Sequence, residues 1–168
     1  MGRVLSVRDL VDERERLRAR GKQVVLTNGH FDLLHVGHLR YLQQARALGD
    51  VLVVGVNSDA STAARKGPDR PIVPQDERAE LLAALSCVDF VVVFDAVTAE
   101  DLVAAVRPDI YAKGGDYSGP GAPPLPEAQV VAAYGGRIII LPELPGHSTT
   151  ELVETVLRRA GPPADGSR

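Results

Sequence analysis

The sequence predicts an α/β fold in which helices cover both faces of a parallel sheet of five strands. Five short apolar runs, typical of buried strands, are separated by segments with helical periodicity. This strand–helix alternation is typical of a parallel sheet, because parallel strands must be joined by long crossover connections. The chain has 168 residues, which suffices for one domain with a sizeable core.

The element boundaries follow from the apolar periodicity and from capping residues. Ser6 can cap the first helix, and Gly21 can end it. The predicted strands are 23–27, 51–56, 88–94, 110–112 and 138–141. The predicted helices are 6–20, 39–48, 75–85, 98–106, 127–134 and 151–159. Together these elements predict a Rossmann-like three-layer fold.

The remaining segments are expected to lack regular structure. Residues 61–74 read as a long basic loop with three prolines, and 118–126 as a flexible flap rich in Gly and Pro. The segment 161–168 reads as a disordered tail. We therefore expect a single domain over residues 1–160.

Composition excludes several classes of protein. The net charge of −3 and the absence of tryptophan argue against a nucleic-acid partner. The single Cys87 excludes an internal disulfide and fits a reducing compartment. No apolar run is long enough to span a membrane, and the first residues lack a signal-peptide pattern. We expect a cytoplasmic protein with no membrane partner.

The stretch 27–38, TNGHFDLLHVGH, carries the strongest indication of function. It lies between a predicted strand and a predicted helix, where backbone N–H groups and the positive helix end converge on one point. His35 and His38 are three residues apart, which places both on one face of the first helical turn. Gly37 between them leaves room for a ligand close to the backbone. The turn therefore predicts chemistry on a phosphate group, although two solvated histidines would show the same spacing.

The chain lacks the sequence motifs of two other classes of nucleotide-binding protein. No G-x-G-x-x-G follows the first strand, which argues against a dinucleotide-dependent oxidoreductase. No G-x-x-x-x-G-K-[ST] is present, which argues against a P-loop ATPase or kinase.

The pattern G-x-F-D-x-x-H-x-G-H over residues 29–38 resembles the signature of the cytidylyltransferase-like nucleotidyltransferases of the H-x-G-H type. The resemblance implies transfer of a nucleoside monophosphate to a small phosphorylated substrate with release of pyrophosphate. Further segments are similar to the adenylyltransferase domain of the ADP-heptose synthase family, over about 23–157. These segments are VNSDAS at 56–61, KG at 66–67, RP at 70–71, VD at 88–89, KGGDY at 113–117 and STT at 148–150.

This closer resemblance implies AMP transfer from ATP to D-glycero-D-manno-heptose 1-phosphate, giving an ADP-sugar and pyrophosphate. Many members carry this domain behind a sugar kinase, so a separate sugar kinase is implied for this chain. The resemblance also implies a homodimer and Mg²⁺ that bridges the nucleotide phosphates with few protein ligands.

The resemblance assigns roles to three groups of residues. The catalytic residues are His35, His38 and Lys113. The nucleotide-binding residues are Asn28, Gly29, Phe31, Asp32, Gly37, Gly114, Asp116, Ser148 and Thr149. The substrate-binding residues are Asn57, Asp59, Lys66 and Arg78. Asp116 is also the acidic residue nearest to the metal, unless it is only a turn carboxylate. Arg78 could equally form a surface ion pair.

Two alternatives to this function remain open. The shared signature also fits a cytidylyltransferase that acts on glycerol 3-phosphate or a similar alcohol phosphate. A nucleotide-binding module that senses its ligand without turnover belongs to another class, and the intact histidine pair argues against it.

Two positions depart from the ADP-heptose synthase pattern. His30 and His147 stand where this family commonly has cysteine. If the signature turn and the last helix contact one triphosphate, these rings should lie within roughly 10 Å of each other. Nearby phosphate would then favour their protonation, which adds a pH-dependent cation to the site. Two unrelated loop histidines are the alternative.

Overall fold

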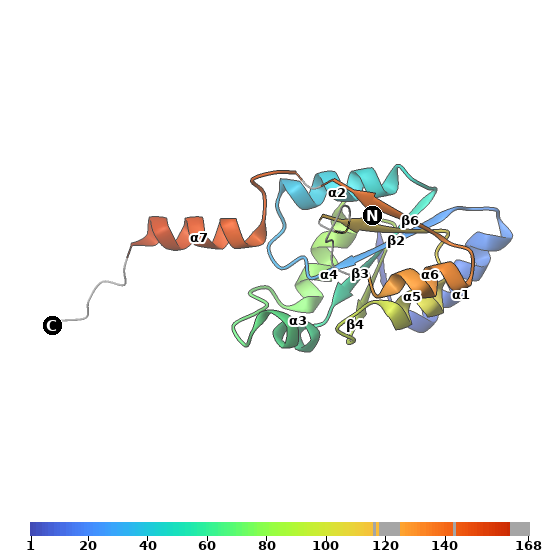
Figure 1. Cartoon of the computed structure of the whole chain (residues 1–168), viewed down its shortest axis with the longest axis horizontal. Helices are drawn as coiled ribbons and strands as arrows, with labels where there is room; N and C mark the ends of the chain where they lie inside the picture. The colour runs from blue at the N-terminus through green and yellow to red at the C-terminus, as the bar shows by residue number, and fades with distance from the viewer. Residues whose placement is uncertain (116, 118–124, 143, 162–168) are drawn as a thin grey trace.

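The computed structural model describes residues 1–115, 117, 125–142 and 144–161, and these contain six strands and seven helices (Figure 1). The strands are β1 (Arg3–Leu5), β2 (Val24–Gly29), β3 (Val51–Asn57), β4 (Phe90–Phe94), β5 (Ile110–Gly114) and β6 (Arg137–Leu141). The helices are α1 (Val7–Ala19), α2 (Val36–Arg46), α3 (Asp59–Lys66), α4 (Gln75–Ala84), α5 (Glu100–Val106), α6 (Glu127–Ala133) and α7 (Thr149–Ala160).

The strands form one parallel sheet in the order β1-β4-β3-β2-β5-β6. From β2 the chain winds outward through β3 and β4 on one side, and then through β5 and β6 on the other. The winding direction therefore reverses between β2 and β5. At such a reversal a crevice opens beyond the carboxyl ends of the strands, where α/β proteins bind their ligands. This topology places the candidate site at the ends of β2 and β5.

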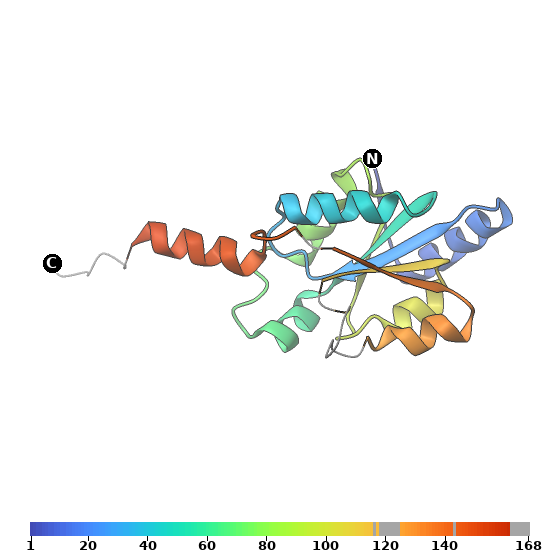
Figure 2. The same ribbon diagram turned by 45° about the horizontal axis from the view of Figure 1, so that its top comes forward.

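Helices cover both faces of the sheet, as the sequence predicts (Figure 2). Successive strand residues point to opposite faces. Leu26 packs in one hydrophobic cluster with side chains of α1, α5 and α6. Its neighbour Val25 packs in a second cluster with side chains of α2 and α4. The three-layer Rossmann-like fold is confirmed.

The prediction of five strands was wrong, because a sixth strand, β1, pairs with β4 at the edge of the sheet. β1 has only three residues, two of them exposed, so its sequence carries no buried-strand pattern. Gly2 allows it to dock, since a Cβ there would lie 2.6 Å from the carbonyl oxygen of Val88. The Gly2 N–H donates to the carbonyl of Ala83, and the Arg3 N–H donates to that of Asp89.

The expected loop over 61–74 begins with a helix instead. α3 covers residues 59–66, and the Ser58 side chain caps it by accepting from the Ser61 N–H. Three alanines favour this helix, and the prolines that favour a loop all follow its last residue. Helix α3 ends at Gly67, whose φ of 103° a glycine adopts without strain. Most of the expected flap and tail, at 118–124 and 162–168, lies outside the described residues.

Helix α7 projects away from the three-layer body in both views (Figures 1 and 2). None of its residues is buried, and the apolar side chains of Leu152, Val156 and Leu157 are exposed. Within the described part of the chain, no helix combines the length and apolar character needed to cross a membrane.

The docking of β1 gives a test of the edge strand. We expect Gly2→Val to detach β1, because the added side chain collides with the Val88 carbonyl, at a cost of about 1–3 kcal/mol. Hydrogen exchange should then show that the Arg3 and Leu5 amides lose protection while β2 and β3 keep theirs. Val4→Thr, at a half-exposed position of the same strand, is the control. Protected Arg3 and Leu5 amides in Gly2→Val would contradict this account of the edge.

Candidate active site

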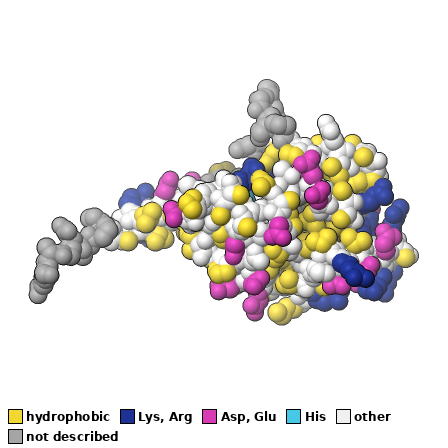
Figure 3. Space-filling model, turned by 90° about the horizontal axis from the view of Figure 1, so that it is seen from below, with side chains coloured by type: hydrophobic (Ala, Val, Ile, Leu, Met, Phe, Trp, Pro, Cys, Tyr) yellow, Lys and Arg dark blue, Asp and Glu magenta, His cyan; other side chains and the backbone are white. Residues whose placement is uncertain are grey.

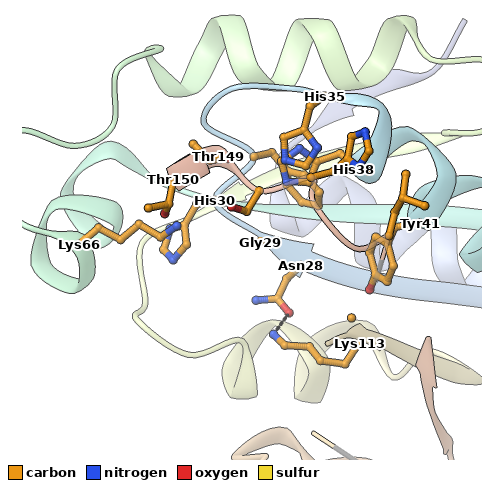
Figure 4. A pocket seen from close by; sticks show the side chains of 16 residues that line it. Asn28, Gly29, His30, His35, His38, Tyr41, Lys66, Lys113, Thr149 and Thr150 are labelled. Atoms are coloured by element: carbon orange, nitrogen blue, oxygen red, sulfur yellow. Dashed lines mark hydrogen bonds between the residues drawn. The ribbon is translucent and has the colours of Figure 1, made fainter. Parts of the chain in front are cut away.

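A cavity of about 280 Å³ opens at the carboxyl ends of β2 and β5, where the winding of the sheet reverses (Figure 4). Its walls come from the signature turn, the start of α2, the end of α3, the end of β5 and the start of α7. The lining residues are Asn28, Gly29, His30, Phe31, His35, Gly37, His38, Tyr41, Lys66, Lys113, Gly114, Leu144, His147, Ser148, Thr149 and Thr150. The described lining thus contains histidines, lysines and hydroxyl groups but no carboxylate.

The two signature histidines form a stacked pair at the start of α2. The helix begins at Val36, three residues earlier than predicted, and His35 is its N-cap residue. The rings of His35 and His38 lie 3.9 Å apart between centroids with an angle of 26°. Gly37 makes this packing possible, because a Cβ there would lie 2.9 Å from His35 Nδ1 and 3.1 Å from His147 Cβ. The predicted common face of the two rings is therefore observed.

Burial keeps the histidine pair uncharged. It lowers the pKa of His38 to about 4, with smaller contributions from His35 and Lys66. Burial and then His147 also lower the pKa of His35. The Nδ1 atoms of both rings are buried and have no hydrogen-bond partner among the described residues. Near neutral pH the pair therefore presents neutral imidazoles, which donate hydrogen bonds rather than carry charge.

Lys113 and Asn28 face each other from β5 and β2 (Figure 4). The Asn28 Oδ1 accepts from Lys113 Nζ at 2.9 Å and from the Tyr111 hydroxyl at 2.6 Å. These two donors fix the amide so that its nitrogen points away from Lys113. Burial lowers the Lys113 pKa, while the carboxylate of Glu127 raises it and so opposes that effect. Lys113 is thus a cation at the wall of the cavity, held in place by Asn28.

His30 and Lys66 line the side of the cavity next to α3. His30 Nδ1 lies 3.0 Å from Thr62 Oγ1, which fixes the ring. Burial, and then the charges of Lys66, Arg65, Arg78 and Lys113, lower the His30 pKa to about 4. Without a phosphate in the cavity, His30 is therefore neutral.

The start of α7 closes the cavity with Ser148, Thr149 and Thr150. Ser148 forms a capping box with Glu151, in which each side chain bonds the other residue's backbone N–H. The Ser148 hydroxyl therefore already binds the protein. The N–H groups of Thr149 and Thr150, at the first two positions of the helix, have no partner inside it. His147 precedes this turn and lines the same cavity as His30, so the two residues belong to one cleft.

Four predicted site residues do not line the cavity. Asp32 is buried and accepts from Arg70 Nη1 and from the backbone N–H groups of Ile72 and Val73. These bonds lower its pKa in spite of its burial. Asp32 therefore ties the signature turn to the loop after α3 and does not line the cavity.

The other three residues, Asn57, Asp59 and Arg78, bond one another or nearby backbone. The Asn57 amide donates to Ser61 Oγ and to the Ala96 carbonyl. Asp59 pairs with Arg78 at 2.7 Å. Their side chains therefore bond within the protein, and none of the three lines the cavity.

Arg78 is fully buried, so the alternative of a surface ion pair was wrong. Its guanidinium donates to the carbonyls of His30, Asn57 and Val73 as well as to Asp59. One side chain thus joins the signature turn, the end of β3 and the loop before α4.

Sequence reasoning missed Tyr41, Leu144 and Thr150 in the lining. Tyr41 follows His38 by three residues on α2, and helical spacing could have identified it. Its hydroxyl bonds Thr27 Oγ1 and donates to the Ala112 carbonyl. Asp116, the predicted metal neighbour, lies outside the described residues. Among those described, no group of three His, Cys, Asp or Glu side chains could hold a metal ion.

A family model described as cytidylyltransferase-like matches residues 26–154. The bifunctional protein HldE of Syntrophotalea carbinolica is 52% identical over 92% of this chain and 30% of that protein. The bifunctional protein HldE of Pseudomonas aeruginosa is 48% identical over 93% of this chain and 32% of that protein. The chain therefore spans less than one third of the length of these two relatives.

A solved structure is also similar over most of the chain. It is the crystal structure of the lipopolysaccharide core biosynthesis protein from Thermoplasma volcanium, with a TM-score of 0.57 and 31% sequence identity. The match covers 74% of this chain and 98% of that one.

The buried histidines predict how stability depends on pH. His30 and His38 have pKa values of about 4 in the folded chain, against an ordinary value of 6.5. Between these values the unfolded chain binds more protons than the folded chain, so the free energy of unfolding should fall as the pH drops from 6.5 to 4. Above pH 6.5 these two groups should contribute no slope.

Chemical denaturation of the wild type and of His38→Gln across this range provides the measurement. We expect the variant to show a clearly smaller loss of stability, because one of the two half-buried imidazoles is gone. His147→Gln, which removes an exposed ring from the same cavity, is the matched control. Equal slopes in the wild type and His38→Gln would rule out a buried neutral His38.

Proposed function

Since the chain belongs to the cytidylyltransferase-like family of nucleotidyltransferases, we propose that it transfers AMP from ATP to a sugar 1-phosphate. The products are an ADP-sugar and pyrophosphate, and the substrate we favour is D-glycero-D-manno-heptose 1-phosphate. The observation that carries the proposal is the cavity at the sheet reversal, lined by the stacked histidines, Lys66 and Lys113 without a described carboxylate. Such a lining suits two phosphorylated substrates. The similarity to the bifunctional HldE proteins and to a lipopolysaccharide core biosynthesis protein supports a sugar substrate.

The reaction requires little proton transfer. A phosphate oxygen of the sugar phosphate is already anionic at neutral pH and attacks the α-phosphorus of ATP. A new P–O bond forms as the bond between the α-phosphorus and the bridging oxygen breaks, and pyrophosphate leaves with the electron pair. The difficulty is to bring two anions together and to stabilise charge at the α-phosphorus. Positioning and electrostatic stabilisation therefore carry the catalysis.

The cavity residues divide between these tasks. His35 and His38 donate hydrogen bonds to the triphosphate and to the transition state. The half-buried Lys113 contributes positive charge at the phosphates. Thr149, the N–H groups at the start of α7 and the positive helix end hold the β- and γ-phosphates. Ser148 acts mainly by capping that helix, since its hydroxyl is engaged with Glu151.

We propose that Mg²⁺ reaches the cavity bound to ATP. Among the described residues the cavity offers no protein cage for a metal, and its lining contains no carboxylate. Mg²⁺ commonly binds through substrate phosphates and water, so it would arrive as the ATP complex. The protein's own groups then need only receive the complexed triphosphate.

We also propose the wider context that the resemblance implies. Residues 1–160 form one nucleotidyltransferase domain, and a sugar kinase activity acts in the same pathway to supply its phosphorylated substrate. A homodimer is proposed, and the exposed apolar side chains of α7 support it, since they have no partner within the described chain.

Pyrophosphate release with a panel of substrates tests the proposed function. Release with ATP and heptose 1-phosphate is the expected result. Release with CTP and glycerol 3-phosphate alone would instead identify an alcohol-phosphate cytidylyltransferase. Tight ATP binding without pyrophosphate from any phosphorylated sugar would identify a binding module.

His38→Ala should lower kcat far more than it weakens ATP binding. The neutral imidazole is expected to bond more strongly to the transition state than to the ground state. Loss of one such donor typically costs roughly 10²–10³ in kcat. Steady-state kinetics together with an ATP titration give the two quantities, and nearly normal turnover would remove His38 from the mechanism.

Lys66→Ala should raise the KM for the sugar phosphate and leave the KM for ATP nearly unchanged. Lys66 ends α3 and lines the cavity next to His30 (Figure 4). Loss of one charge-assisted hydrogen bond corresponds to roughly a tenfold change in KM. Arg65→Ala removes the same charge from the preceding residue, which does not line the cavity, and is the control. A rise confined to the KM for ATP would reverse the assignment.

A further inference from the structure

A second cavity of about 280 Å³ lies at the amino ends of the strands, opposite the candidate active site. It opens where β2, β5 and β6 begin, whereas the candidate active site lies where β2 and β5 end. Strands of five or six residues rise about 3.3 Å per residue, so roughly 15–20 Å of sheet separates the two cavities. The lining residues are Arg14, Arg18, Gln23, Arg107, Pro108, Asp109, Tyr134, Gly135, Gly136 and Arg137.

Positive charge dominates this second cavity. Four arginines line it, from α1, from the end of α5 and from the start of β6, against the single carboxylate of Asp109. Lys and Arg side chains gather at the end of the molecule where α1 lies (Figure 3). The whole chain carries a net charge of −3, so this local excess of arginine is not a reflection of overall composition.

Arg14 is a buried arginine with an unused donor group. It is 6% exposed. Its Nε and Nη2 atoms donate to the Arg107 carbonyl, and Nη2 also pairs with Asp109 at 3.1 Å. Its Nη1 is buried and has no acceptor among the described residues. A buried charged donor without an acceptor is costly, so an external acceptor, either water or an anion, would stabilise this side chain.

Tyr134 adds a second unused donor. Its hydroxyl is buried without a partner in the described chain, and the Arg107 guanidinium lies 5.3 Å from the centre of its ring. Burial raises the Tyr134 pKa to about 12, so the phenol keeps its proton and donates. Gly136 permits this packing, because a Cβ there would lie 2.6 Å from the Tyr134 ring.

We propose that this second cavity binds a phosphate-class oxyanion, either inorganic phosphate or the phosphate group of a small phosphomonoester. Arg14 Nη1 and the Tyr134 hydroxyl are the buried donors, and Arg18 and Arg137 supply charge from the exposed rim. Guanidinium groups match phosphate oxygens in geometry as well as charge. Four arginines and a phenol in one lining offer more donors than a single planar carboxylate can use, which favours a phosphate. This site is separate from the cleft assigned to the nucleotide and does not depend on the proposed function.

Amide chemical shifts of the ¹⁵N-labelled full chain test the proposal during titration with inorganic phosphate. Gly135 and Gly136 report on the second cavity, and Gly37 and Gly114 report separately on the catalytic cleft. We expect saturable shifts or broadening at Gly135 and Gly136 in the millimolar range or below. A parallel titration with glucose 6-phosphate identifies the source, since the tighter of the two probes is the better model of the natural ligand.

The double variant Arg18→Gln with Arg137→Gln should weaken the response at Gly135 and Gly136 roughly tenfold or more. Both residues are exposed, so this variant should fold even if Arg14→Gln does not. Arg8→Gln removes the same charge from an exposed position of α1 outside the cavity and should leave the response unchanged. An absent response in the wild type, or an equal one in the double variant, would overturn the proposal.

Discussion

The candidate active site depends on one buried cation, the guanidinium of Arg78. It satisfies the carbonyl groups of His30, Asn57 and Val73 and pairs with Asp59. These partners belong to the signature turn after β2, the end of β3 with the start of α3, and the loop before α4, which are separate in sequence. Burying an arginine is costly unless its donors are satisfied, so the three segments and the cation hold one another in a single arrangement. The wall of the cleft next to α3 follows from that arrangement.

Burial determines the chemistry on the other walls as well. The stacked pair of His35 and His38 is kept neutral, so it supplies hydrogen bonds, while the cleft's positive charge comes from Lys66 and Lys113. This separation suits a reaction in which both substrates are anions and the nucleophile needs no base. The sheet positions both cavities. Its winding reversal lies at the first cavity, and the arginines of the second cavity lie at the amino ends of its strands.

The sequence predicted the features that follow from local periodicity and from a contiguous motif. The strand–helix alternation, the turn and the common face of His35 and His38 are of this kind. It did not predict β1, because three half-exposed residues at a sheet edge carry no pattern. It also did not predict that Asp32 and Arg78 join loops, since sequence alone does not distinguish a charge that faces a substrate from a charge that joins loops. Only the tertiary structure brings together the partners that satisfy these two side chains.

The affinity of Arg78→Met for ATP tests most directly whether this buried cation shapes the cleft. Methionine fills much of the same volume but cannot satisfy the three carbonyl groups. At a temperature where the variant is folded, we expect ATP to bind at least roughly tenfold more weakly, equivalent to about 1.4 kcal/mol, although Arg78 does not line the cavity. Arg65→Met, at an exposed position of α3, should bind ATP with nearly wild-type affinity. Wild-type ATP affinity in a folded Arg78→Met would contradict the account.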